Sequence, residues 1–257
     1  MSSLFLSHGS PLIAIREDSY TKFLHKLGQE LKRPKAIVLF TAHWESEVLT
    51  LSCHDETYKM IYDFGGFPDE MYQITYPAKG STEVVKLTQQ LLSNKGITTK
   101  LDTDRGLDHG SWTLLKHLYP DATIPVVQAS VNPFLPAEEQ YQIGEALRGL
   151  AKHDILLIGS GSTVHNLHIL NWDQKEPEQW AIQFDQWLID QITTQNKEAL
   201  FHYASQAPHA ERAVPRPEHF VPFLITAGAC SSEASVLFQG YELGSLSYLC
   251  VGFDLNL

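Results

Sequence analysis

The stretches AIVLFTAHW (residues 36–44) and ILLIGSGSTVHN (residues 155–166) decide the fold class of this chain. Each opens with a short apolar run that is rich in Ile, Val and Leu. Runs of this length and composition, bounded by Gly or polar residues, are typical of buried strands in α/β sheets. Each stretch also carries a histidine, His43 or His165, shortly after its apolar run ends.

Two further histidines stand in comparable positions. His8 follows an apolar run in LFLSHGSP, and His219 lies in PRPEHFVPF, before an apolar stretch that predicts a helix. In open α/β sheets the ligand crevice lies at the carboxyl ends of the strands. We therefore expect His8, His43 and His165 to share one edge of one sheet. A cluster of neutral imidazoles is a typical site for a divalent transition metal.

The pattern along the whole chain predicts one α/β domain, residues 1–257, with a mostly parallel central sheet flanked by helices. The predicted strands are residues 3–7, 36–41, 49–52, 97–101, 124–129, 155–159, 235–238 and 246–251. The predicted helices are residues 19–31, 81–92, a short helix capped by Ser111, 137–152, 179–194 and 217–229.

The composition narrows the class of protein. Of 257 residues, 43% are hydrophobic and 19% charged, which is typical of a globular protein. The net charge of −11 argues against nucleic acid as a partner. Three widely spaced cysteines without a C-x-x-C pair argue against a disulfide framework and fit a reducing, cytoplasmic location. We expect no membrane-spanning segment and no secretory signal.

Each motif also has a simpler interpretation. His8 alone fits an incidental turn histidine, and His43 alone fits a core histidine bonded to a carbonyl, but together they favour metal binding. In DHGSW, Asp108 either orients an imidazole or, with Ser111, caps a helix. The small residues of GSGS permit close approach of a ligand, although G-K-[ST] is missing and Thr163 breaks a nucleophile-elbow pattern.

Taken together, these motifs resemble a known family. L-x-x-L-S-H-G-S-P, T-A-H-W, D-F-G-G-F-P, Y-P-A-x-G-S, G-L-D-H-G-S-W, G-S-G-S-x-V-H-N-L and P-x-P-E-H-F occur in order from residue 4 to about residue 220. This combination resembles the 4,5-DOPA dioxygenase extradiol family, a group within the class III, LigB-type extradiol ring-cleavage dioxygenases. The resemblance implies a LigB-like fold and one catalytic domain.

The resemblance also implies the roles of the histidines. One divalent metal is expected, Fe(II) for dioxygenase activity, with Zn(II) possible in the isolated protein. His8 and His43 would be ligands and His219 the third. His165 would be a fourth ligand or the active-site base, and His109 a second catalytic histidine near the substrate oxygens. The wider class uses two histidines and a carboxylate, which leaves Glu218 as an alternative third ligand.

The expected activity is extradiol cleavage of a small aromatic diol, such as a DOPA-like catechol, by O₂. Two other functions stay open on the residues alone. One is a zinc-dependent hydrolase on the same scaffold, in which zinc generates hydroxide from water. The other is a non-catalytic LigB-like binding protein. The sequence does not select one catechol, the native metal or the oligomeric state.

Overall fold

Four parallel strands form the centre of the sheet, in the order β5, β2, β6, β1. Their bounds are β1 (Ser3–Ser7), β2 (Ala36–Glu45), β5 (Val126–Val131) and β6 (Ile155–Gly161). These are the most apolar runs of the sequence, and their residues are almost all buried. A strand covered on both faces reads as a continuous apolar run, which is why these four were predictable.

The computed structural model describes residues 3–255, and within them the main sheet has eight strands. The order is β4-β3-β5-β2-β6-β1-β10-β7, with antiparallel pairs between β3 and β5, β1 and β10, and β10 and β7. The remaining bounds are β3 (Thr50–Ser52), β4 (Lys100–Asp102), β7 (Ala234–Phe238), β8 (Tyr241–Glu242), β9 (Leu246–Ser247) and β10 (Cys250–Phe253). The predicted single α/β domain with a mostly parallel sheet is confirmed.

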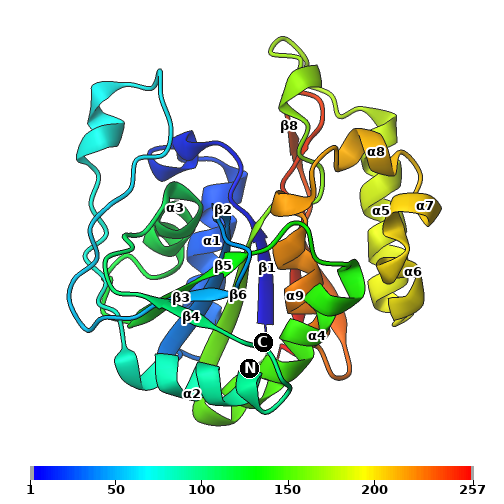
Figure 1. Cartoon of the computed structure of the whole chain (residues 1–257). Coiled ribbons are helices and arrows are strands. Elements are labelled where there is room, and N and C mark those ends of the chain that lie inside the picture. The colour runs from blue at the N-terminus through cyan, green and yellow to red at the C-terminus, as the bar shows by residue number, and fades with distance from the viewer. Residues whose placement is uncertain (1–2, 256–257) are drawn as a thin grey trace.

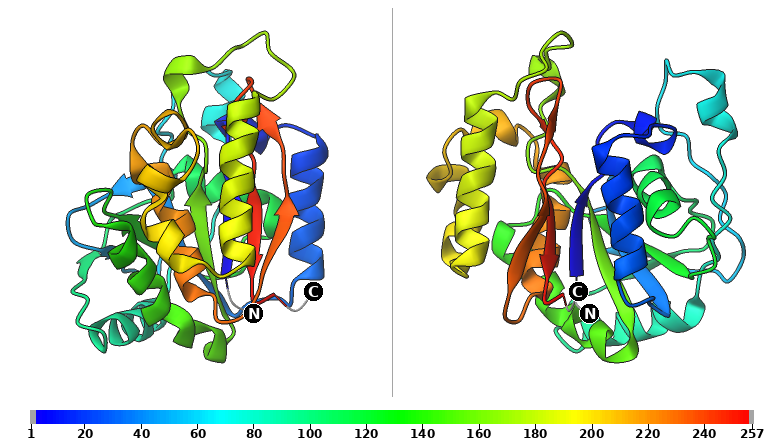
Figure 2. Two further views of the ribbon diagram at one scale, coloured as in Figure 1. Left: turned by 90° about the vertical axis from the view of Figure 1, so that its right-hand side faces the viewer. Right: turned by 180° about the vertical axis from the view of Figure 1, so that it is seen from behind.

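Helices cover both faces of the sheet (Figure 1). The α-helices are α1 (Ser19–Glu30), α2 (Thr82–Ser93), α3 (His109–Leu118), α4 (Ala137–Leu147), α5 (Gln179–Thr193), α6 (Lys197–Phe201), α7 (Tyr203–Gln206), α8 (Ala210–Ala213) and α9 (Val221–Ala229). The 3₁₀ turns are η1 (Pro11–Ala14), η2 (Asp69–Gln73), η3 (Arg148–His153), η4 (Leu167–Ile169) and η5 (Pro217–His219). Figure 2 shows α1 and α5 on opposite sides of the sheet.

Successive side chains of the central strands point to opposite faces of the sheet, so they contribute to two separate cores, one under the helices of each face. Ile37 and Leu39 of β2 pack into the core that contains α1 and α3. Val38 and Phe40 point the other way, into the core beneath α4 and α9. Successive side chains of a strand point to opposite faces, so one apolar run supplies both cores.

Three predicted elements are divided in the structure, and one of them, the predicted helix at 137–152, consists of α4 followed by the 3₁₀ turn η3. The predicted strand at 246–251 is wrong, because β9 and β10 belong to different sheets. The hydroxyl of Ser247 donates to Asp185 and accepts from the backbone N–H of Leu249, and such local bonds compete with strand pairing. The predicted helix at 217–229 splits into η5 and α9, because Pro222 has no N–H for the carbonyl of Glu218.

Smaller differences concern element ends. β4 and β5 begin later than predicted, β2 extends to Glu45, and the helices α6 to α8 were not predicted. The predicted cap at Ser111 is wrong, because α3 begins at His109 with Asp108 as its N-cap.

All three cysteines are free thiols. Within residues 3–255, no helix has the length and apolar character that a membrane crossing requires.

Candidate metal centre

His8 and His43 reach the carboxyl edge of the sheet from two strands that flank β6. His8 directly follows β1, and its side chain is buried. The sequence predicted that His43 follows the strand, but in the structure His43 lies inside β2. From Phe40 to Glu45 the chain advances five residues along β2 but only two along β5, from Ala129 to Val131. Such a bulge re-aims side chains at the end of a strand, here that of His43.

His109 reaches the same edge from the first turn of α3. Asp108 caps this helix, and its carboxylate also accepts hydrogen bonds from Thr41, Arg105 and Gln128. Of the two roles open for Asp108, the structure shows capping, and no histidine bonds to it. Gly110 makes the close approach possible, because a Cβ there would lie 2.9 Å from Cδ2 of His43 and 3.2 Å from Oγ1 of Thr41.

His219 is placed by the small residues of the GSGS motif. A Cβ on Gly161 would lie 2.1 Å from the carbonyl oxygen of His219, and the N–H of Ser162 donates to that oxygen at 2.9 Å. The glycine therefore permits close approach of η5 to the end of β6. The sequence predicted that these small residues permit close approach of a ligand; at Gly161 the close contact is with the protein's own backbone.

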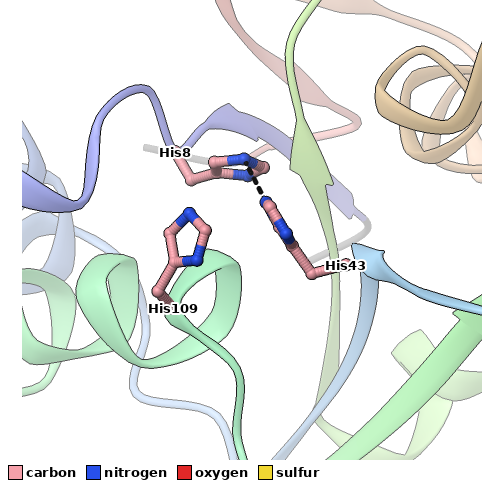
Figure 3. Close-up of side chains that lie close together, drawn as sticks. All are labelled: His8, His43 and His109. Atoms are coloured by element: carbon pink, nitrogen blue, oxygen red, sulfur yellow. Dashed lines mark hydrogen bonds between the residues drawn. The ribbon is translucent and has the colours of Figure 1, made fainter. Parts of the chain in front are cut away.

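The five predicted site histidines lie together at this edge. Ring centroids are 4.8 Å apart for His8 and His43, 5.1 Å for His8 and His219, and 5.1 Å for His43 and His219. His109 lies 4.1 Å from His43 and 5.5 Å from His8. Figure 3 shows His8, His43 and His109 turned toward one another from separate elements. We call these three residues the anchored triad.

His165 forms a second group with His219. Their rings stack face to face, with centroids 3.5 Å apart and an interplanar angle of 10°. We call them the stacked pair. One ligand atom from each of His165, Glu218 and His219 lies within 4.8 Å of the others. Within the part of the chain that the structure describes, no other side chain donates a hydrogen bond to the ring of His165 or accepts one from it.

The Nδ1 atoms of four of these rings have acceptors. His43 and His109 bond through Nδ1 to the carboxylate of Asp63, at 3.1 and 2.9 Å. His219 bonds through Nδ1 to Glu218 at 3.0 Å. Nδ1 of His8 lies 2.9 Å from Oγ of Ser160, whose own proton goes to the carbonyl of Gly110. These acceptors favour a proton on Nδ1 and a lone pair on Nε2 in all four rings.

The Nε2 atoms of His8 and His43 face each other, and with both protons on Nδ1 no proton lies between them. Nε2 of His8 and Nε2 of His43 are only 3.0 Å apart. Nε2 of His219 is buried and has no hydrogen-bond partner. An unpartnered buried polar atom is costly, and facing lone pairs repel each other. A divalent cation would satisfy these atoms, so the residues fit the metal that the sequence predicts.

Burial favours the neutral imidazole at His8, His109, His165 and His219. It lowers the pKa of His8 and of His219 well below the usual 6.5, and neighbouring histidines lower both further. It lowers the pKa of His165 to about 4. Burial alone would raise the pKa of Asp63, but hydrogen bonds from His109 and His43 outweigh it and hold that pKa well below the usual range. Neutral imidazoles beside an ionised carboxylate are the state that metal binding requires.

Sequence reasoning missed two residues of this site. Asp63 was noted only as part of a turn, DFGGFP, and Ser160 only as one of the small residues that follow the apolar run 155–158. Both act on rings that are distant in the sequence, so spacing gave no signal for them. Glu218 was a candidate ligand, and in the structure its Oε1 bonds to His219 while Oε2 lies 3.5 Å from Arg216.

Comparisons with known proteins agree with this site. The family model described as the catalytic LigB subunit of aromatic ring-opening dioxygenase matches residues 2–251. The chain is 37% identical to a 4,5-DOPA dioxygenase extradiol of Escherichia coli, over 98% of this chain and 94% of that protein. It is 37% identical to the protein of that name from Beta vulgaris, over 96% and 94%.

A solved structure shows the same fold over nearly the whole chain. The crystal structure of an uncharacterized protein from Escherichia coli K12 superimposes with a TM-score of 0.82 and 31% sequence identity, covering 98% of each chain. The resemblance seen in the motifs is therefore confirmed, and with it the expectation of an extradiol ring-opening dioxygenase. The chain belongs to the LigB family of aromatic ring-opening dioxygenases.

Proposed function

We propose that this protein, as one catalytic domain over residues 1–257, cleaves a small aromatic diol by extradiol addition of O₂ at a single non-haem metal. The supporting observation is the set of converging Nε2 atoms, each with its Nδ1 atom bonded elsewhere. The cysteine usage supports a cytoplasmic location. The relatives' name suggests a DOPA-like catechol as the substrate class.

His8, His43 and His219 would hold the metal. Their ring centroids lie 4.8 to 5.1 Å apart, and Nε2 of His219 is the buried atom without a partner. Glu218 would orient His219, because its Oε1 accepts from Nδ1 of that ring. When bound, Fe(II) would supply Lewis acidity toward the diol oxygens and a change of oxidation state for electron transfer between ring and O₂.

His165 and His109 would handle protons. His165 is neutral at pH 7, and no other side chain bonds to its ring, so it is free to accept a proton from a diol hydroxyl. His109 is held through Nδ1, which leaves its Nε2 beside the ligands, where the substrate oxygens are expected. The reaction breaks a ring C–C bond adjacent to the diol and places both atoms of O₂ in the semialdehyde product, with no further reductant.

The test begins with metal-free protein loaded anaerobically with Fe(II). Oxygen uptake is then measured with L-DOPA, caffeate and protocatechuate, and the product is analysed by mass spectrometry with ¹⁸O₂. We expect oxygen uptake, a yellow semialdehyde and two labelled oxygen atoms. The Zn(II)-loaded protein should be inactive, because zinc has no accessible redox change. Hydrolysis of an ester or amide by the zinc form, without oxygen uptake by the iron form, would replace this proposal with the hydrolase.

A further inference from the structure

Asp63 lies outside the sheet but contacts two site histidines at once. It belongs to the segment between β3 and η2, which rises beside the carboxyl edge of the sheet (Figure 1). Its Oδ1 accepts from the backbone N–H of His109 at 3.0 Å and from Nδ1 of the same residue at 2.9 Å. Its Oδ2 accepts from Nδ1 of His43 at 3.1 Å. One carboxylate therefore joins a proposed metal ligand to a proposed catalytic histidine.

We propose that Asp63 is a positioning residue that fixes His43 and His109 in the Nδ1–H tautomer. A carboxylate without a proton can only accept hydrogen bonds, so each ring must present an N–H to it. Both Nε2 lone pairs then point into the cluster. The tautomer assignment stands on this geometry alone, and its consequence for metal binding rests on the function proposed above.

A purely structural role for Asp63 would need fewer contacts. Of the contacts of Asp63, only the bond from the backbone N–H of His109 helps to satisfy the first turn of α3. The bond from Oδ2 to His43 adds nothing to that helix. A carboxylate or carbonyl behind a ligating histidine is the usual device that orients the ring and raises its basicity. Here one carboxylate does this for two rings.

The segment around Asp63 is anchored on both sides. The hydroxyl of Tyr62 donates to the carbonyl of Ile74 at 2.8 Å. The ring of Phe64 meets the ring of His109 edge-on, with centroids 5.6 Å apart. These contacts fix the carboxylate relative to α3 before any metal binds.

Asparagine at position 63 gives the sharpest test, because it keeps the size and replaces one acceptor by a donor. His109 offers two donors, so the amide oxygen should remain on His109. The amide NH₂ then faces Nδ1 of His43, which must become an acceptor and carry its proton on Nε2. The conservative variant Asp63→Asn should therefore turn the metal-binding lone pair of His43 away, whereas Asp63→Ala only releases both rings.

The experiment uses ¹⁵N-histidine-labelled full-length protein without metal. Imidazole ¹⁵N–¹H correlation spectra report the tautomer of each ring, and chelator competition gives the Kd for Zn(II). We expect Nδ1–H for His43 and His109 in the natural protein and Nε2–H for His43 in Asp63→Asn. The Kd should rise by roughly 10- to 100-fold in Asp63→Asn. Asp69→Asn, at an exposed aspartate that begins η2, should change neither the tautomers nor the Kd.

Two results would overturn the proposal. One is an Nε2–H tautomer at His43 or His109 in the natural metal-free protein, which needs no variant to fold. The other is an Asp63→Asn protein with unchanged tautomers and unchanged Kd. Neither result depends on catalysis. An inactive natural enzyme with the expected tautomers would remove the proposed function and leave this inference intact.

Discussion

The rings of the anchored triad are held by residues far away in the sequence, whereas His219 is held by its own neighbour, Glu218. Ser160 bonds to His8, and Asp63 bonds to both His43 and His109. Among the residues that the structure describes, His165 has no side-chain hydrogen bond, and its ring stacks on His219. The triad is therefore fixed by the fold before metal binds. The stacked pair has fewer side-chain hydrogen bonds, with one from His219 to Glu218.

This difference suggests separate functions for the two groups, metal binding for fixed rings and proton transfer for rings with fewer hydrogen bonds. Fixed lone pairs give a metal a prepared site, because little reorganisation is needed on binding. A ring without a hydrogen-bonded partner can move a proton between the substrate and its surroundings. The division is not complete, because His219 of the stacked pair is a proposed metal ligand and His109 of the anchored triad is a proposed proton carrier. The predictions below test this division.

The largest effect is expected from removing a ring that binds metal. His43→Ala should lose stoichiometric metal and all ring-cleaving activity, and His219→Ala should do the same. His109→Ala should keep the metal, because we assign it to proton handling. Elemental analysis of the purified proteins checks this. Metal retained in His219→Ala but lost in His109→Ala would show that the anchored triad is itself the ligand set.

The next effect concerns the base. His165→Gln should lower kcat by roughly 100-fold or more, the usual scale for a general base, while metal content stays unchanged. His168→Ala, a nearby residue in η4, serves as the control and should keep full activity. A normal kcat in His165→Gln would remove this residue from the mechanism. Loss of metal in that variant would make His165 a fourth ligand.

A smaller effect should follow from filling the space beneath the triad. Gly110→Ala places a methyl group 2.9 Å from Cδ2 of His43 and 3.3 Å from Nδ1 of His8, so these side chains would have to shift. We expect a loss of about 1–3 kcal/mol in the free energy of unfolding and weaker metal binding. Gly65→Ala is the matched control, because nothing lies within 4 Å of a Cβ there. Chemical denaturation of both variants measures this loss. Equal free energies of unfolding for the two variants would contradict the prediction.

The smallest effect is a change in pH dependence. Burial lowers the pKa of His165 to about 4 from its usual 6.5, so the unfolded chain takes up a proton between these values that the folded chain does not. The free energy of unfolding of the metal-free protein should therefore fall as pH decreases from 6.5 to 4. His165→Gln should reduce this slope by up to about 1.4 kcal/mol per pH unit. Identical slopes for both proteins would contradict the assigned neutral state.

The sequence by itself determined the fold class and the place of the site. Apolar runs such as Ala36–Phe40 and Ile155–Ile158 must be buried on both faces, and parallel strands bring their carboxyl ends to one edge. Histidines just beyond such runs therefore lie close together, independently of the conformation of the loops. The family motifs added the expected chemistry, and the comparisons confirmed the family.

Only the tertiary structure decided how each ring is turned. The bond from Asp63 to His43 and His109, and that from Ser160 to His8, join segments whose spacing in the sequence carries no periodic signal. The bulge in β2 and the contact of Gly161 with the carbonyl of His219 likewise depend on neighbouring elements. A side chain's tautomer and direction follow from its partners in space, and the chain acquires those partners only when it is folded.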